Sequence, residues 1–405
     1  MNSRPLRICH LGKYYPPAPG GLERHVRLLA RGQAELGAEV RVLCVNHLDS
    51  HGRDLTWRPI GRSAAVDESD GPVRVSRIGR IASIARFDLC PALPAAMRDL
   101  DFGETDLLHL HAPNPAMLMA ASKWARSTPL VISHHSDVVR QKLLGRAFRA
   151  FERRAYRRAA LVFANSPTYA AGSPLLRQFA DRLRCLPLGI DLDPFLAPAA
   201  ESLRVAAEWT QRFGEPLWLC VGRLVYYKGL ENAIRALARV PGRLAIIGTG
   251  PREQSLKRLA CDEGVSDRLI WCGPVSDETL AGAYRAATAL WFPSNARSEA
   301  FGLVQVEAMA SGCPVINSFV PHSGISWVCR HEEEGLTVPV NDPPALAAAV
   351  RRLLDEPGLR ERLAGAGRDR AIREFAYQTM AARCLNLYRE VMEKDGRPFM
   401  QAAAQ

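Results

Sequence analysis

Two glutamates with a Phe-Gly pair between them mark the segment with the clearest chemical potential, SEAFGLVQVEAMASGCP at residues 298–314. Glu299 and Glu307 are eight positions apart. A helix is predicted to begin after the Phe-Gly pair, so the backbone N–H groups of Gly302–Val304 would face a phosphate. The two carboxylates would flank that phosphate and accept hydrogen bonds from sugar hydroxyls. Glutamates on an ordinary surface helix would not require the intervening Phe-Gly.

A second segment places two positive side chains directly after a predicted strand. The strand covers residues 217–221, and GRLVYYKG follows at residues 222–229. Open α/β sheets bind ligands at the carboxyl ends of their strands. There Arg223 offers a planar fork of donors and Lys228 a point charge, a combination that suits a diphosphate. A basic loop that contacts only solvent would have the same composition.

A glycine pair near the start of the chain predicts a further ligand-binding turn. Gly20 and Gly21 end the sequence PPAPGG, between a predicted strand and a predicted helix. Glycine lets backbone N–H groups approach a ligand, and the start of the following helix favours an anion. A tight turn that binds nothing is an equal alternative for this segment alone.

Histidines follow another predicted strand. His134, His135 and Asp137 lie in VISHHSDVVRQK, at residues 131–142. A histidine at this position could hydrogen-bond a hydroxyl of a bound ligand or transfer a proton. The two histidines are adjacent and have no evident third ligand, so no metal site is predicted here.

A basic amphipathic helix is predicted over residues 140–158. Its eight basic residues are Arg140, Lys142, Arg146, Arg149, Arg153, Arg154, Arg157 and Arg158. Leucines and phenylalanines are interleaved at helical spacing, which is typical of a helix on an anionic membrane surface or at an acceptor site. An ordinary surface helix packed on its own domain is the alternative. Nucleic acid is not an expected partner, because no nucleic-acid-binding motif accompanies the charge.

Short apolar runs alternate with longer amphipathic segments along the whole chain. The runs predicted as strands are 7–11, 40–45, 107–111, 130–133 and 161–165 in the first half, and 217–221, 244–248, 269–273, 289–293 and 314–317 in the second. Nearly continuous apolar strands separated by helices predict a parallel sheet covered on both faces. Two such series predict an α/β chain with two doubly wound, Rossmann-like domains.

The predicted domain boundary lies near residues 189–198, where periodicity is lost and turn residues gather. We therefore predict an N-terminal domain at residues 1–195 and a C-terminal domain at residues 196–376. A long amphipathic helix begins near residue 377 and precedes a tail that ends at residue 405. This helix could close the second domain or return to the first.

The composition is that of an ordinary globular protein, with 47% hydrophobic and 23% charged residues among 405. Residues 1–200 contain 28 basic and 18 acidic side chains, and residues 201–405 contain 25 and 24, so the two domains should meet different partners. The ten cysteines are scattered without a CxxC pair, which predicts reduced, structural thiols. Since no apolar run is long enough to span a membrane and no signal peptide is evident, we expect a cytoplasmic protein.

With these motifs in place, the chain resembles the retaining nucleotide-sugar glycosyltransferases of the GT-B fold, glycosyltransferase family 4. The resemblance extends from residue 15 through the final helix and is most specific in the segment that contains Glu299 and Glu307. It implies two Rossmann-like domains that face an interdomain cleft, with the acceptor bound by the first domain and the donor by the second. GRLVYYKG and HSDVVRQK are similar to bacterial mannosyl- and rhamnosyltransferases that build surface polysaccharides such as O antigen from GDP-activated sugars.

The resemblance also implies roles for single residues. Those implied in catalysis are His135, Arg223, Lys228 and Glu299. Those implied in donor binding are Gly20, Gly21, Arg223, Lys228, Gly248, Val275, Glu299, Phe301, Gly302, Leu303, Val304 and Glu307. Glu299 would hold the donor sugar and Glu307 the ribose. Since this chain has Ser-His-His-Ser where the family has Thr-x-His, His134 is a rival to His135.

The expected reaction transfers a hexose, mannose or rhamnose from a GDP-sugar, to a hydroxyl of a glycan or lipid-linked acceptor, with retention at the anomeric carbon. The expected partners also include an anionic membrane surface, which would make the protein peripheral at the inner face of the cell membrane. No metal or other cofactor is expected, because Arg223 and Lys228 would stabilise the leaving diphosphate. The alternatives are a UDP-sugar-dependent transferase, a nucleotide-sugar epimerase of the GT-B fold, a DNA-modifying glycosyltransferase and a non-catalytic sugar-binding protein.

Overall fold

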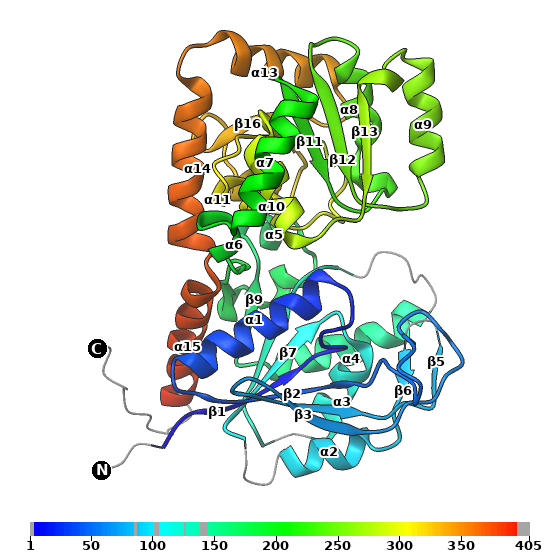
Figure 1. Cartoon of the computed structure of the whole chain (residues 1–405). Helices are drawn as coiled ribbons and strands as arrows, with labels where there is room; N and C mark the ends of the chain where they lie inside the picture. The colour runs from blue at the N-terminus through cyan, green and yellow to red at the C-terminus, as the bar shows by residue number, and fades with distance from the viewer. Residues whose placement is uncertain (1–3, 85–86, 101–104, 125–126, 138–143, 395–405) are drawn as a thin grey trace. The chain divides into compact units, whose positions relative to one another are not determined.

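The computed structural model describes residues 4–84, 87–100, 105–124, 127–137 and 144–394, with the backbone alone described at 124, 144–149 and 394. The chain forms two compact units. Unit 1 comprises residues 1–165, 173–189 and 377–405, and unit 2 comprises residues 166–172 and 190–376. Figure 1 shows the elements of each unit.

Unit 1 is built on an eight-stranded sheet with the order β10-β9-β8-β7-β1-β2-β4-β3. All neighbouring strands are parallel except β3 and β4. The strands are β1 (Arg7–Leu11), β2 (Glu39–Val45), β3 (Val66–Asp70), β4 (Val73–Ile78), β7 (Leu107–Ala112), β8 (Leu130–His134), β9 (Leu161–Ala164) and β10 (Leu183–Cys185), with a separate hairpin of β5 (Ala82–Ile84) and β6 (Phe87–Leu89).

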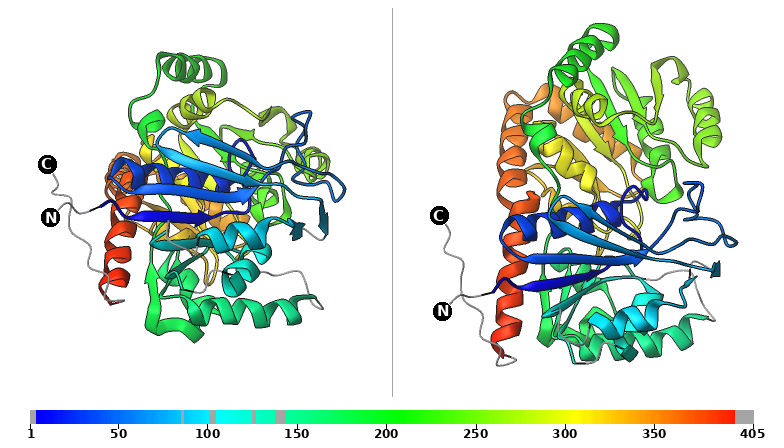
Figure 2. Two further views of the ribbon diagram at one scale, coloured as in Figure 1. Left: turned by 90° about the horizontal axis from the view of Figure 1, so that it is seen from below. Right: turned by 60° about the horizontal axis from the view of Figure 1, so that its bottom comes forward.

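Helices cover both faces of this sheet, and Figure 2 shows α1 on the face opposite α3 and α4. The helices of unit 1 are α1 (Gly21–Glu35), α2 (Leu93–Asp99), α3 (Pro115–Trp124), α4 (Leu144–Arg158), the 3₁₀ helix η2 (Leu176–Arg182) and α15 (Tyr377–Lys394).

The helix predicted near residue 377 returns to unit 1, where α15 lies beside α1 (Figures 1 and 2). Gly32 of α1 permits the close approach, because a Cβ atom there would be 2.7 Å from the Cβ of Ala381. The Tyr377 hydroxyl donates to Glu35 at 3.0 Å. Met380, Tyr388 and other buried residues of α15 belong to the same hydrophobic core as the strands of unit 1.

Unit 2 is built on a six-stranded parallel sheet with the order β13-β12-β11-β14-β15-β16. The strands are β11 (Leu217–Val221), β12 (Arg243–Ile247), β13 (Leu269–Gly273), β14 (Ala289–Phe292), β15 (Val315–Phe319) and β16 (Gly335–Pro339). The helices are α5 (Pro167–Gly172), α6 (Asp193–Leu196), α7 (Ala200–Phe213), α8 (Leu230–Leu237), α9 (Glu253–Asp262), α10 (Asp277–Ala286), α11 (Leu303–Ala310), α12 (Ile325–Val328), α13 (Pro343–Asp355) and α14 (Leu359–Phe375), with 3₁₀ helices η3 (Tyr226–Lys228) and η4 (Ser266–Arg268).

The two sheets confirm the predicted α/β architecture with two doubly wound domains. The chain divides elsewhere than predicted, because the boundary after residue 195 falls inside unit 2. The Ile190 N–H donates to the Phe375 carbonyl at 2.9 Å, and Arg285 donates to the Phe195 carbonyl at the same distance. Residues 166–172 also belong to unit 2, where Arg297 donates to the Tyr169 carbonyl.

Candidate functional site

Two turns beside the ends of strands in unit 2 are ones that only glycine can form without displacing its neighbours. A Cβ atom on Gly248, which follows β12, would lie 2.2 Å from the Gly222 carbonyl oxygen at the end of β11. Gly229 has φ +61° and would place a Cβ atom 2.1 Å from the Pro293 carbonyl oxygen. The GRLVYYKG loop therefore lies directly against the carboxyl ends of β12 and β14.

Two of the predicted site residues meet in this place. Lys228 Nζ and Glu299 Oε2 are 2.7 Å apart, and each side chain is 14% exposed. The ammonium group also lies 4.8 Å from the ring centroid of Phe292, so it packs against the last residue of β14. Arg223, the other predicted cation, is exposed, and within the described part of the chain it forms no side-chain hydrogen bond or ion pair.

The segment between the two glutamates forms the start of α11. Gly302 is the N-cap with φ +82°, where a Cβ atom would lie 2.8 Å from both Gln305 and the Phe292 ring. Phe301 is buried, whereas Leu303 and Val304 are half-buried in the first turn. Since the first N–H groups of a helix have no partner within it, this turn offers donors to an anion.

Buried polar side chains hold this turn, and sequence reasoning missed them. Gln305 donates to the Phe301 carbonyl at 3.3 Å, and Asn317 of β15 donates to Gln305 Oε1 at 2.9 Å. The Ser323 hydroxyl donates to the Glu299 carbonyl at 2.5 Å. These contacts join three segments that are distant in sequence, so no local motif signals them.

Glu307 lies in the middle of α11 and accepts a hydrogen bond at 2.9 Å from the Tyr284 hydroxyl of α10. Burial, followed by the negative charge of Glu307, raises the pKa of Tyr284 well above its usual value. Tyr284 therefore stays a hydroxyl donor that orients the Glu307 carboxylate. Val275 is half-buried between β13 and α10, where Ser276 caps the helix.

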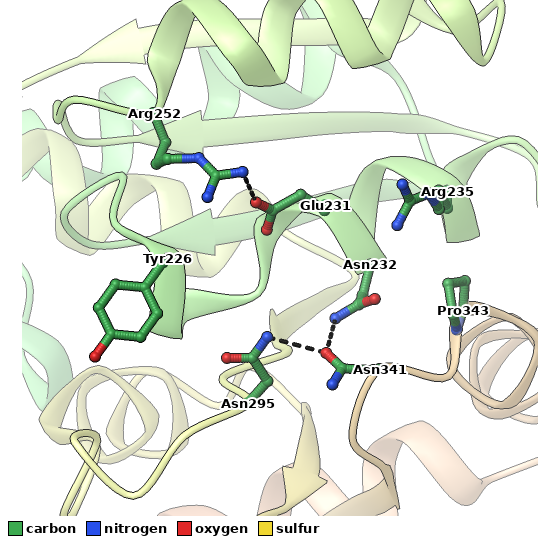
Figure 3. Close-up of a pocket in the computed structure, with 8 residues that line it drawn as sticks. All are labelled: Tyr226, Glu231, Asn232, Arg235, Arg252, Asn295, Asn341 and Pro343. Carbon is green, nitrogen blue, oxygen red and sulfur yellow. Dashed lines mark hydrogen bonds and ion pairs between the residues drawn. The ribbon is translucent and has the colours of Figure 1, made fainter.

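A cavity of about 490 Å³ is lined by Tyr226 of the GRLVYYKG loop and by seven residues from other segments, and Figure 3 shows their side chains. Asn341 Oδ1 accepts from the amides of Asn232 and Asn295, at 3.2 and 2.9 Å. Arg252 and Glu231 form an ion pair on its wall. None of the residues predicted to bind the donor lines this cavity.

In unit 1, the glycine pair begins α1 as predicted. Gly20 is the N-cap with φ +157°, and a Cβ atom there would lie 2.0 Å from Glu23 Oε2. Gly20 and Gly21 are exposed, and burial raises the pKa of Glu23. The start of α1 thus brings the Glu23 carboxylate close to the backbone of an exposed glycine pair.

The structure distinguishes the two adjacent histidines. His134 is 2% exposed, and its ring nitrogens lie 2.6 Å from the Tyr156 hydroxyl and 3.1 Å from Asp137. His135 is half-buried and lies 3.1 Å, nitrogen to nitrogen, from His111. His134 therefore supports the fold, and His135 is the histidine with surface left for a ligand.

The basic helix is only partly described. Arg140 and Lys142 lie outside the described residues, as do the side chains of Arg146 and Arg149. Arg153 and Arg154 of α4 are exposed. Within the described residues, no helix is long and apolar enough to cross a membrane.

Comparisons with known proteins cover both units. Residues 19–194 match the family model Glycosyltransferase Family 4, and residues 206–370 match Glycosyl transferases group 1. The chain is 29% identical over 360 residues to the D-rhamnosyltransferase WbpZ of Pseudomonas aeruginosa, covering 87% of each chain. It is 27% identical over 394 residues to the O-antigen chain mannosyltransferase C of Escherichia coli, covering 96% of this chain and 99% of the relative. Sucrose-phosphate synthase from Thermosynechococcus elongatus has a similar structure, with a TM-score of 0.75, 25% identity and coverage of 96% of this chain and 100% of that one.

Proposed function

Because the chain belongs to the glycosyltransferases of the GT-B fold, we propose that it transfers a hexose from a nucleoside diphosphate sugar to an acceptor hydroxyl. The sugar is mannose or D-rhamnose carried by GDP, and the acceptor is a glycan or lipid-linked oligosaccharide of a bacterial surface polysaccharide. The names of the O-antigen mannosyltransferase and the D-rhamnosyltransferase support this choice.

The ion pair between Lys228 and Glu299 is the observation that carries the proposal. It places a cation and a carboxylate within 2.7 Å of each other, at the carboxyl edge of the sheet of unit 2. A nucleoside diphosphate sugar needs both groups, because its diphosphate is an anion and its sugar offers hydroxyl donors. When the donor binds, Lys228 pairs with the diphosphate and Glu299 accepts hydrogen bonds from the sugar hydroxyls, so neither charge is left unpaired.

The chemical step follows from this binding mode. Negative charge grows on the departing diphosphate, and Lys228, exposed Arg223 and the N–H groups at the start of α11 stabilise it. This stabilisation needs no metal ion, so transfer should persist in a chelator. Glu299 orients the sugar and forms no covalent bond to it, since front-face attack with retention requires no enzymatic nucleophile. Unit 1 supplies the acceptor site, with His135 as its hydrogen-bonding group.

A thermal-shift panel with GDP, UDP, ADP and TDP tests the donor assignment, since a ligand that binds the folded state raises the unfolding temperature. We expect GDP to give the largest shift and Lys228→Ala to abolish it. A shift with UDP alone would overturn the GDP assignment. Consumption of the donor at the full rate without any acceptor would indicate an epimerase instead.

A further inference from the structure

Three histidines form an end-to-end chain inside unit 1. The Nδ1 atom of His10 lies 3.0 Å from Nε2 of His111, whose Nδ1 lies 3.1 Å from Nε2 of His135. The ring centroids are 5.3 and 5.4 Å apart and the ring planes differ by 26° and 19°. The rings therefore meet nitrogen to nitrogen, in the manner of hydrogen-bonded imidazoles. The chain begins at Gln33 of α1, whose Oε1 is 2.7 Å from Nε2 of His10.

All three rings are neutral near pH 7. Burial lowers the pKa of His10 to about 4 and the pKa values of His111 and His135 well below the usual value. A neutral imidazole has one N–H donor and one acceptor nitrogen. If one ring donates a hydrogen bond to its neighbour in this row of histidines, the next ring must donate in the same direction. The group at the Gln33 end of the row therefore sets the direction of every hydrogen bond.

Tyr388 of α15 determines which way Gln33 points. The Tyr388 hydroxyl is 2.5 Å from Nδ1 of His109, a contact in which the neutral ring nitrogen can accept the hydroxyl hydrogen. Tyr388 thus donates its hydrogen to His109, and it accepts from Gln33 Nε2 at 3.3 Å. His109 then donates from Nε2 to the Ser133 hydroxyl at 2.8 Å. With its amide nitrogen turned to Tyr388, Gln33 presents its oxygen to His10.

We propose that Gln33 and Tyr388 are positioning residues that fix His10, His111 and His135 as Nε2–H tautomers. Nδ1 of His135 is then a hydrogen-bond acceptor. Within the described residues nothing hydrogen-bonds this atom, and it is not among the fully buried unpaired nitrogens, unlike both ring nitrogens of His25. A ligand that contacts Nδ1 of His135 must offer a hydrogen-bond donor such as a sugar hydroxyl, since the lone pairs of a phosphate oxygen would repel the lone pair of this nitrogen. The identity of that ligand rests on the proposed function, whereas the tautomers do not.

The tautomers can be measured directly by NMR of the full chain labelled with ¹⁵N-histidine, without any substrate. Protonated and unprotonated ring nitrogens have well-separated ¹⁵N shifts, and single His→Asn variants assign the signals. We expect His135 to be protonated at Nε2 alone between pH 6 and pH 8. Protonation at Nδ1, or an even mixture of tautomers, would overturn the proposal. If the tautomers are as expected but no sugar transfer is found, only the proposed function fails.

Two substitutions of Gln33 separate positioning from packing. Gln33→Leu removes the end group, so the His135 signal should become a mixture of tautomers. Gln33→Glu still accepts from His10 and should leave His135 unchanged. Tyr388 must then donate to the new carboxylate, which should move the proton of His109 to Nδ1. Gln178→Leu, an exposed substitution in unit 1, is the control and should change no histidine signal.

Metal binding is the competing interpretation of these histidines. His10, His109 and His111, and likewise His25, His111 and His135, have ring nitrogens within 4.8 Å of one another. The nitrogen-to-nitrogen hydrogen bonds oppose it, because they occupy the lone pairs that a metal would need. We expect Zn²⁺ or Co²⁺ titration to leave the histidine signals unchanged, and stoichiometric binding that shifts them would refute the fixed tautomers.

Discussion

At the scale of single residues, the pairing of Lys228 with Glu299 links two segments of the chain that sequence analysis had treated separately. Both residues are only 14% exposed, so the charges lie in a partly desolvated place. Charge stabilisation is stronger there than in open solvent. The Lys228 side chain therefore has more effect on a bound diphosphate than an ordinary surface lysine would have.

Lys228→Ala should lower kcat/KM for the donor about 100-fold or more, since it removes a preorganised cation from the leaving group. Steady-state kinetics with the donor identified by thermal shift would measure this. Lys257→Ala is the matched control, because Lys257 pairs with Glu253 at 2.6 Å on α9, away from Glu299 in the sequence. Unchanged kinetics in Lys228→Ala would contradict the donor site.

Lys228 and Glu299 could be predicted from sequence because they are charged and lie close to turn glycines. Tyr284, Gln305 and Gln33 could not, although each orients a neighbour. Their contacts join positions such as 284 with 307 or 33 with 388, and a buried glutamine resembles any other helix residue in a linear pattern. Of these histidines only His134 and His135 were predicted as site residues, because His111 of β7 and His25 of α1, which contact His135, come from elements that are distant in the sequence.

At the scale of elements, the start of α11 depends on a left-handed residue. Gly302→Ala should destabilise the protein by about 1–2 kcal/mol, the usual cost of this conformation for a residue with a Cβ atom. It should also weaken nucleotide binding, because the first turn of α11 must shift away from Phe292. Denaturant unfolding and a nucleotide titration would measure both effects.

Gly365→Ala provides the control for that substitution. Gly365 lies in α14 at an exposed position, and a Cβ atom there would have no neighbour within 4 Å. This variant should gain about 0.5–1 kcal/mol from helix propensity and leave binding unchanged. Equal losses in the two variants would show that Gly302 has no special role.

The exposed face of α4 predicts attraction to anionic lipid. Arg153, Arg154 and Phe151 are exposed, a combination that suits the surface of a membrane. Replacing both arginines by glutamate should reduce cosedimentation with phosphatidylglycerol vesicles at least tenfold. The same change at Lys257 and Arg258 of α9 should have little effect. Equal losses in both pairs would point to net charge alone, and no binding by the wild type would refute the membrane assignment.

Most strands could be predicted because they are continuous apolar runs. β4 and β3 were missed because VRVSRI alternates apolar with polar residues and VDESD is almost entirely polar. β3 is the edge strand and is mostly exposed, so the pattern of a buried strand does not apply to it, whereas β4 lies between β2 and β3 and is mostly buried despite its polar residues. β16, which is GLTVP, was missed because it begins with Gly and ends with Pro, and it is an edge strand.

At the scale of the whole molecule, the buried histidines should make the stability of unit 1 more sensitive to low pH than that of unit 2. Burial lowers the pKa of His10 to about 4 and of His25 to about 3, and it lowers those of His109, His111 and His135 well below the usual value. In the unfolded chain these histidines would bind protons below about pH 6.5, whereas in the folded state they would stay unprotonated. Unit 1 should therefore lose stability as pH falls from about 6.5 toward 4.

The expected loss for His10 alone is about 1.5 kcal/mol between pH 6.5 and pH 5, because its pKa of about 4 in the folded state leaves it unprotonated there. Limited proteolysis at pH 7 and pH 5, with the fragments mapped, should show cleavage in unit 1 before unit 2. His25→Leu should weaken this pH dependence, because it removes a buried group that binds a proton only in the unfolded state, and within the described residues its ring nitrogens have no partner to lose. Exposed His51→Asn should leave it unchanged, and cleavage that begins in unit 2 would contradict the prediction.

The division of the chain was the least predictable property at this scale. Loss of periodicity near residue 189 indicated where the chain passes from unit 1 to unit 2. The exact residue depends on contacts such as that of Ile190 with Phe375, which no local pattern contains. The assignment of residues 166–172 to unit 2 depends in the same way on Arg297 and on the fit of Gly172 against His322.

The position of α15 beside α1 has a consequence for biosynthesis. Ribosomes release the chain in order, so the β-strands of unit 1 emerge long before the helix that completes their core. Unit 2 is almost continuous and can fold while α15 is still being translated. The strands of unit 1 must wait with apolar surface exposed, which makes nascent chains that stall before residue 377 natural clients of chaperones.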